Sequence, residues 1–344
     1  MKNTDNEIFN SLRKLFKENK GNIVVITHEN PDGDAIGSSV GIAEVLRNYG
    51  HTVNIIVPND YPAFLKWFSS DINIIIYDKA KRKAQRLIKS ADLIICLDFN
   101  NPDRTAKMSR YILQSDQPKV MVDHHPNPEK FCNYMISETE YSSTAELVFR
   151  LLERIKLTKY MNCASAEALY AGVMTDTGSF SHNIARQGPF LVAAELMKWD
   201  IDTEKIHAAV YHNYTFNRMK LLGYCLNKKM EVYPELRSAV IYISREELHE
   251  YNFQPGDTEG FVNYPLSINN IIFSALFIEK RDVVKASFRS KGSFPVNLFS
   301  QRYYNGGGHL NAAGGESKLS LSETIERFKQ QLDEYKEQLL EIKV

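Results

Sequence analysis

The first 125 residues contain five short runs rich in valine and isoleucine, and these runs restrict the fold more than any other feature. They span residues 22–28, 52–57, 72–77, 93–98 and 119–124. Most of them lack the alternation of apolar and polar residues, which is typical of parallel strands covered on both faces. A helix is expected between the first two runs, at residues 36–49, with Gly50 as its stop signal. This order predicts an open α/β sheet whose ligands bind at the carboxyl ends of the strands.

The second half of the chain has a different pattern. Helices are expected at residues 141–155 and 164–174, and residues 203–227 form a helical stretch suited to bridging two domains. Strand-like runs return at residues 239–243, 271–279 and 283–289. The last helix, at residues 322–342, carries an apolar stripe. That stripe predicts packing on its own sheet more strongly than a dimer seam.

These patterns predict two α/β domains, which fits a length of 344 residues at roughly 100–200 residues per domain. Residues 1–195 would form an N-terminal domain with an open, mainly parallel sheet. Residues 196–230 would form a helical linker, and residues 231–344 a smaller domain with a mixed sheet.

Composition disfavours several classes of protein. Lysine plus arginine and aspartate plus glutamate both number 42, so the formal net charge is zero, whereas proteins that bind long duplex DNA usually show a basic footprint. The four cysteines are too scattered for a zinc site or a disulfide framework and fit a reducing compartment. No signal peptide and no apolar run of about 18 residues is present. We therefore expect a cytoplasmic protein that binds neither membranes nor long duplex DNA.

Acidic and imidazole residues gather where the predicted strands end. His28, Asp32 and Asp34 lie on one short turn after the first run. Asp98 ends the fourth run, and Asp123-His124-His125 ends the fifth. One such aspartate is more often a helix cap or part of a surface turn than a ligand. Three strand ends of a parallel sheet, however, converge on one crevice.

A fourth acidic group, Asp176, lies in a turn after an apolar helix, where it could also be a cap. Four or five carboxylates in one cleft need a compensating cation. Carboxylates and imidazoles without thiolates suit Mn²⁺, Mg²⁺ or Fe²⁺. Two such ions can activate a water and stabilise a phosphoryl centre. The pattern therefore predicts a metal-dependent phosphoesterase.

A glycine-rich segment, residues 305–309, reads Asn-Gly-Gly-Gly-His. It lacks both the P-loop and the dinucleotide-binding spacing. Its backbone amides could approach an anion closely, or the segment could be a flexible hairpin tip. Small residues after it are expected to begin a helix. Arg289, at the end of a predicted strand, could clamp a phosphate, although alone it is typical of a surface charge.

Taken together and in this order, these motifs resemble the DHH/DHHA1 phosphoesterase family over nearly the whole chain. The resemblance implies one divalent ion on His28, Asp32 and Asp98. It implies a second ion on Asp34, Asp98, His124 and Asp176, with Asp98 bridging. Asp123 would orient His124, and His125 would face the substrate phosphate, so His125, Asp98 and Asp123 are the implied catalytic residues. The implied substrate-binding residues are Arg104, Arg289, Gly306, Gly307, Gly308 and His309.

The similarity is greatest to the stand-alone branch of that family. Its members shorten very short oligoribonucleotides, and many dephosphorylate 3′-phosphoadenosine 5′-phosphate. The resemblance therefore implies a two-metal phosphodiesterase and phosphomonoesterase that uses Mn²⁺, with Mg²⁺ or Fe²⁺ as alternatives. The implied partners are short single-stranded RNA and small nucleotides, and a homodimer is compatible with the family.

Other specificities remain open on the same scaffold: linear or cyclic dinucleotides, polyphosphate, or longer single strands. A non-catalytic nucleotide sensor is disfavoured because every expected ligand is present. Asn305 stands where relatives often have a fourth glycine. Asparagine tolerates unusual backbone angles, so the loop is expected to keep its shape.

Overall fold

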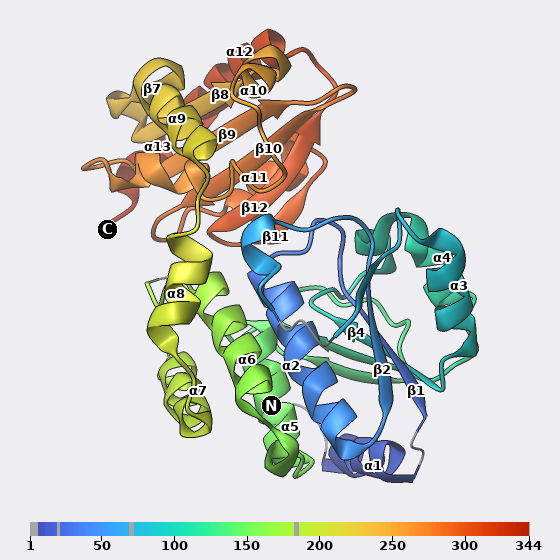
Figure 1. Ribbon diagram of the computed structural model, residues 1–344. Helices are drawn as coiled ribbons and strands as arrows, with labels where there is room; N and C mark the ends of the chain where they lie inside the picture. The colour runs from blue at the N-terminus through green and yellow to red at the C-terminus, as the bar shows by residue number, and fades with distance from the viewer. Residues whose placement is uncertain (1–5, 19–20, 69–71, 182–185, 344) are drawn as a thin grey trace. The chain divides into compact units, whose positions relative to one another are not determined.

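The computed structural model describes residues 6–18, 21–68, 72–181 and 186–343 (Figure 1). The chain divides into two compact units, residues 1–213 and 214–344. The division falls inside the predicted linker, between helices α8 (Thr203–Tyr211) and α9 (Phe216–Tyr224). The Thr215 side chain accepts a hydrogen bond from the Arg218 backbone and caps α9, so a new helix begins there.

The first unit contains a six-stranded sheet in the order β3-β2-β1-β4-β5-β6, in which all neighbouring strands are parallel. Its strands are β1 (Asn22–Ile26), β2 (Thr52–Val57), β3 (Ile74–Ile76), β4 (Leu93–Leu97), β5 (Lys119–Asp123) and β6 (Tyr134–Ser137). This confirms the predicted open parallel sheet. Only β6, a four-residue edge strand, had no recognisable sequence signal. The strand order reverses between β1 and β4, which places a ligand crevice at their carboxyl ends.

Helices cover both faces of this sheet (Figure 1). One face packs against α1 (Asn6–Glu18), α2 (Gly33–Tyr49), α5 (Thr144–Arg154) and α6 (Cys163–Asp176), and the other against α3 (Lys81–Ser90) and α4 (Ser109–Leu113). Within β1, Ile23 and Val25 belong to the first core, and Val24 and Ile26 to the second. Burial on both faces explains why the strands show no polar alternation. The unit also contains α7 (Gly188–Leu196) and α8.

Close packing of α2 against α6 positions the residues at their ends. A Cβ atom on Gly37 would lie 2.5 Å from the Ala168 carbonyl oxygen and 2.8 Å from the Gly172 nitrogen. Only glycine at position 37 therefore permits this approach of the two backbones. The approach brings the start of α2, with Asp34, beside the end of α6, with Asp176.

The second unit contains a mixed sheet in the order β11-β12-β10-β9-β8-β7, in which only β8 and β9 are parallel neighbours. Its strands are β7 (Met230–Tyr233), β8 (Ser238–Ile243), β9 (Phe273–Glu279), β10 (Val284–Ser290), β11 (Gly307–His309) and β12 (Ala312–Ser317). The mixed sheet confirms the prediction. The prediction of a helix after the glycine-rich segment is wrong, because residues 312–317 pair with β10 as a strand. Pairing with a neighbouring strand outweighs the helix preference of the alanines.

The helices of the second unit are α9, α10 (Arg245–Glu250), α11 (Val296–Tyr303), α12 (Leu321–Glu334) and α13 (Lys336–Glu341). The last two form the predicted C-terminal helix, interrupted at Tyr335. Phe328 and Leu332 of its apolar stripe are buried with Phe273 and Phe277 of β9. The stripe therefore packs on its own sheet, as expected. No helix in the described part of the chain is both long and apolar enough for a membrane span.

Candidate metal centre

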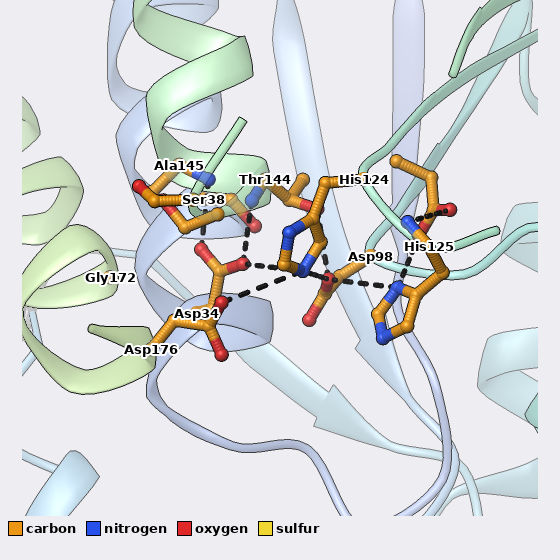
Figure 2. A network of polar contacts seen from close by, with 12 residues as sticks. Asp34, Ser38, Asp98, His124, His125, Thr144, Ala145, Gly172 and Asp176 are labelled. Atoms are coloured by element: carbon orange, nitrogen blue, oxygen red, sulfur yellow. Dashed lines mark hydrogen bonds and ion pairs between the residues drawn. The ribbon is translucent and has the colours of Figure 1, made fainter. Parts of the chain in front are cut away.

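The carboxyl ends of β1, β4 and β5 bring the predicted acidic and imidazole residues together. Figure 2 shows Asp34, Asp98, His124 and Asp176 of this cluster. Two of the groups whose ligand atoms all lie within 4.8 Å of one another contain the predicted ligands: His28, Asp32 and Asp98, and Asp34, His124 and Asp176. Asp98 connects the groups. Its Oδ2 lies 3.3 Å from His28 Nε2, and its Oδ1 lies 3.7 Å from His124 Nε2.

The turn after β1 positions Asp32 and Asp34 in different ways. Asp32 is the N-cap of α2, and its Oδ1 accepts hydrogen bonds from the backbone nitrogens of Asp34 and Ala35. Asp34 points the other way, toward the start of α5. Its Oδ2 accepts from the Thr144 nitrogen at 2.6 Å and its Oδ1 from the Ala145 nitrogen at 2.8 Å. The first turn of α5 therefore fixes the Asp34 carboxylate in one orientation.

Asp98 directly follows β4 in a left-handed backbone conformation, with φ at 64°. This conformation is uncommon for residues other than glycine, although aspartate adopts it more readily than most, and strained residues of this kind cluster at functional sites. The side chain is only 2 % exposed, and its Oδ1 accepts a hydrogen bond from Thr144 Oγ1 at 2.8 Å. Asp98 therefore lies between the two groups in a strained, tightly held geometry.

Different surroundings move the pKa values of the two central carboxyl groups in opposite directions. Burial raises the pKa of Asp34 well above its ordinary value, and the nearby charges of Asp98, Asp176 and Asp32 raise it further. Burial opposes ionisation of Asp98 as well. The hydrogen bond to His28 and the charges of the neighbouring imidazoles outweigh this effect and hold the pKa of Asp98 well below its ordinary value. The chain's own cations therefore favour ionisation of Asp98 but leave Asp34 poorly compensated.

Burial and the neighbouring carboxylates also shift the pKa values of the histidines. Burial lowers the pKa values of His28 and His124, but neighbouring carboxylates outweigh it, and both pKa values are raised overall. The main carboxylate beside His28 is Asp98, and the main one beside His124 is Asp176. His28 Nδ1 lies 2.8 Å from the Glu29 carbonyl oxygen, which orients its Nε2 toward Asp98.

The Asp123 carboxylate accepts two hydrogen bonds from His125, whereas the expected role of this aspartate was to orient His124. Its Oδ2 accepts from the His125 backbone nitrogen and its Oδ1 from His125 Nδ1, both at 2.8 Å. His124 Nδ1 instead lies 3.3 Å from the Tyr141 carbonyl oxygen. The reason is local: an aspartate that ends a strand bonds the backbone nitrogen two residues later, which places its carboxylate beside that residue.

Arg104 lies near the histidines. Its carbonyl oxygen accepts a hydrogen bond from the Glu29 nitrogen at 2.7 Å. Burial lowers the pKa of His125, and the Arg104 charge lowers it further against the effect of Asp123. Arg104 therefore lies beside the turn after β1, and its role in binding the substrate phosphate stays a prediction.

The predicted substrate-binding residues of the second unit gather on the β10–β12–β11 edge of its sheet. Arg289 and His309 both pair with Ala312, from opposite sides. Residues directly opposite one another in a sheet project from the same face, so this register places Arg289 and His309 on one face.

The glycine-rich loop itself has an unusual backbone. Gly308 has φ at 142°, and a Cβ atom on it would lie 2.4 Å from the Ala312 carbonyl oxygen. Asn305 also has a positive φ, at 46°, a conformation that asparagine tolerates better than most residues.

Comparison with known proteins agrees with this arrangement. The model of the DHH family, N-terminal domain, matches residues 22–173, and that of the DHHA1 domain matches residues 237–338. The chain belongs to the DHH family.

Three relatives of this DHH protein illustrate the range of the family. The crystal structure of an exopolyphosphatase-related protein from Bacteroides fragilis is 42% identical, covers 99% of this chain and 100% of that one, and has a TM-score of 0.94. The bifunctional oligoribonuclease and PAP phosphatase NrnA of Bacillus subtilis is 28% identical over 295 residues, which are 85% of this chain and 88% of NrnA. The cyclic-di-AMP phosphodiesterase GdpP of Bacillus subtilis is 28% identical over an alignment of 344 residues that covers 95% of this chain but only 50% of GdpP.

The DHH centre contains a residue that the motifs did not reveal. Thr144 contacts both Asp34 and Asp98, although it lies 110 and 46 positions away from them. Its sequence context, Ser142-Ser143-Thr144 before an apolar helix, indicated only a helix start. Ser143 is indeed the N-cap of α5. A hydroxyl next to a helix cap carries no sequence signal for contacts with distant carboxylates.

Proposed function

We propose that this DHH protein is a metal-dependent phosphoesterase that shortens very short oligoribonucleotides and hydrolyses 3′-phosphoadenosine 5′-phosphate to AMP. One observation carries the proposal: a group of carboxylates and imidazoles that includes the buried Asp98 lies next to a second such group at the switch point of a parallel sheet, with Asp98 Oδ1 3.7 Å from His124 Nε2 of the second group. Such a set of ligands fits two divalent cations and lacks the thiolates of structural zinc sites.

In this proposal, His28, Asp32 and Asp98 hold one ion, and Asp34, Asp98, His124 and Asp176 hold the other. The poorly compensated negative charge at Asp34 supports a cation there. When bound, Mn²⁺, or alternatively Mg²⁺ or Fe²⁺, would supply Lewis-acid chemistry and an activated water.

The chain's own residues supply the remaining functions. Asp123 accepts from His125 Nδ1 and so sets the ring orientation, and we assign the opposite nitrogen, Nε2, to the substrate phosphate. Arg289 and His309, on one face of the second sheet, would bind the nucleotide phosphate and base together with the backbone of Gly306, Gly307 and Gly308. Arg104 would add a positive charge beside His125 during the reaction.

The choice of substrate rests on the relatives and on the charge of the chain. NrnA, named as an oligoribonuclease and PAP phosphatase, matches this chain along most of both lengths, whereas GdpP matches along only half of its own length. A net charge of zero suits short substrates better than long ones. Polyphosphate is the second candidate, because the relative with 42% identity is described as exopolyphosphatase-related.

The test is a panel of substrates with Mn²⁺, with and without a chelator. It contains a 5′-labelled RNA dinucleotide, a five-mer, a 24-mer, 3′-phosphoadenosine 5′-phosphate, a linear adenosine dinucleotide and polyphosphate. We expect fast, chelator-sensitive cleavage of the dinucleotide and the bisphosphate and slow cleavage of the 24-mer. Processive loss of the 24-mer, or faster release of phosphate from polyphosphate, would replace the proposed substrate class. Nucleotide binding without cleavage of any substrate would indicate a sensor.

A further inference from the structure

One residue at the start of α5, Thr144, contacts two carboxylates of the candidate metal centre. The Thr144 backbone nitrogen donates to Asp34 Oδ2 at 2.6 Å, and its hydroxyl donates to Asp98 Oδ1 at 2.8 Å. The residue is completely buried, and the two carboxylates come from different motifs (Figure 2). A single side chain and its own backbone therefore connect the two carboxylates that lie at the middle of the site.

We infer that Thr144 is a positioning residue, which sets the orientation of Asp98 relative to Asp34 and thereby the spacing of the two ligand groups. The inference rests on the proposed metal-dependent function. Asp98 can serve both groups only if its two oxygens face opposite ways, with Oδ2 toward His28 and Oδ1 toward His124. A donor on Oδ1 fixes the rotation of the carboxylate about its Cβ–Cγ bond. Partners of ligands commonly have this function at metal sites.

Threonine is well suited to this position. Its β-branched side chain has few χ1 rotamers, so its hydroxyl remains in one direction. Its backbone nitrogen is one of the first in α5, where the helix has no internal acceptor for it and where the helix dipole favours a carboxylate. Serine would keep the hydroxyl but hold it less firmly, and valine would keep the shape without the hydroxyl.

Neighbours of Thr144 contribute to the same arrangement. The Ala145 nitrogen donates to Asp34 Oδ1, and the Tyr141 carbonyl oxygen lies 3.3 Å from His124 Nδ1. The turn between them is fixed by Glu146, whose Oε2 accepts from the Ser142 nitrogen and hydroxyl at 3.0 and 2.7 Å. Residues 141–146 thus contact groups from three motifs, and Thr144 contacts two of the carboxylates, Asp34 and Asp98.

The competing explanation is that the Thr144 hydroxyl only satisfies a buried carboxylate and so contributes to stability. The experiment compares Thr144→Val and Thr144→Ser with wild type after chelator treatment and dialysis. It measures Mn²⁺ affinity by titration calorimetry, kcat and KM on the RNA dinucleotide, and thermal unfolding of the metal-free protein. Thr324→Val is the matched control, because it removes another buried threonine hydroxyl, bonded to Ser317 Oγ at 2.9 Å in the second unit.

We expect Thr144→Val to weaken Mn²⁺ binding roughly 10–100-fold and to lower kcat by a similar factor with little change in KM. Thr144→Ser should stay within about threefold of wild type in both quantities, since it keeps the donor. Thr324→Val should change unfolding but not Mn²⁺ affinity. If Thr144→Val is not folded at the assay temperature, Thr144→Ala takes its place, with the same expected losses.

The measurements distinguish a failure of the positioning role from a failure of the proposed function. Wild-type affinity and kcat in folded Thr144→Val, beside a wild type that binds Mn²⁺ and turns over, would overturn the positioning role alone. A change in unfolding temperature without a change in affinity or kcat would assign Thr144 to stability and equally overturn it. A wild type that neither binds Mn²⁺ nor cleaves the dinucleotide would overturn the proposed function and this inference with it.

Discussion

The candidate metal centre of the first unit and the glycine-rich edge of the second unit differ in composition. The first consists of charged side chains, of which Asp34, Asp98 and Asp123 are at most 2 % exposed. The second consists mainly of backbone, with half-buried Arg289 and His309 beside it. Buried charges must be compensated and oriented, whereas a backbone surface requires only the right shape. Mutations in the first region should therefore change metal binding and kcat, and mutations in the second should change KM or stability.

The largest expected effect is that of Asp98→Asn. Asparagine keeps the shape of the side chain and tolerates the left-handed backbone at φ 64°, but it removes the charge shared by both ligand groups. Stabilisation by metal ions is worth several kcal/mol, so kcat on the dinucleotide should fall by roughly a thousandfold or more. Asp98 pairs with His28 and its pKa lies well below its ordinary value, so its charge stabilises the fold at neutral pH, and Asp98→Asn should also lower the unfolding temperature of the metal-free protein. Steady-state kinetics and calorimetry measure both quantities.

A matched control for this variant is Asp78→Asn. Asp78 also follows a strand of the same sheet, β3, but it is exposed and lies outside both ligand groups. Its substitution should leave kcat and Mn²⁺ affinity within twofold of wild type. Asp98→Asn with normal kcat would show that the chemistry of this unit does not depend on the shared carboxylate, and the contrast between the two regions would disappear.

The next largest effect should come from Arg289→Ala in the second unit. Hydrogen bonds to charged groups contribute about 1.5–3 kcal/mol, so KM should rise roughly 10–100-fold while kcat and Mn²⁺ affinity change little. Lys285→Ala is the control, because Lys285 lies four residues earlier on β10 and pairs with Glu316 at 3.1 Å. That variant should keep the wild-type KM. A lower kcat for Arg289→Ala at unchanged KM would move this arginine into the chemistry instead.

Gly306→Ala should affect stability more than catalysis. A Cβ atom at this position would lie 1.9 Å from the Gly314 carbonyl oxygen and 2.3 Å from Ser300 Oγ. Overpacking of this kind costs about 1–3 kcal/mol, which denaturant unfolding would detect.

Gly307→Ala, in the same motif, tests whether substrate approaches the backbone of the loop. The nearest atom to its Cβ would be Gln301 Nε2 at 3.8 Å, so the chain itself can accommodate a methyl group. Normal stability with a raised KM would indicate that substrate approaches the backbone there. Normal stability with a normal KM would show that Gly307 takes no part in binding, and the anion-binding role of the loop would be restricted to its neighbours.

The same contrast explains what the sequence could predict. The acidic and imidazole residues of the first unit were predictable because each follows an apolar run, and parallel strands bring their ends together. The orientation of Asp123 toward His125 was not, since it depends on the turn after β5. Thr144 was missed because its role arises from contact between helix starts far apart in the chain. Strand β12 was read as a helix because its alanines and glycines carry no strand signal of their own, and its pairing with β10 decides its structure.

The smallest expected effect is that of Asn305→Gly, and it separates backbone shape from side-chain chemistry in the glycine-rich loop. Asn305 has φ at 46°, so glycine would relieve the strain of a left-handed conformation. Glycine would also increase the entropy of the unfolded chain, by roughly 0.5–1 kcal/mol, which offsets that gain. The free energy of unfolding should therefore stay within about 0.5 kcal/mol of wild type, whereas Asn305→Val should destabilise by about 1–2 kcal/mol. Because Asn305 is exposed, a changed ratio of dinucleotide to bisphosphate cleavage in Asn305→Gly would mean that its amide contacts substrate, and the second region would then use side-chain chemistry beyond its arginine and histidine.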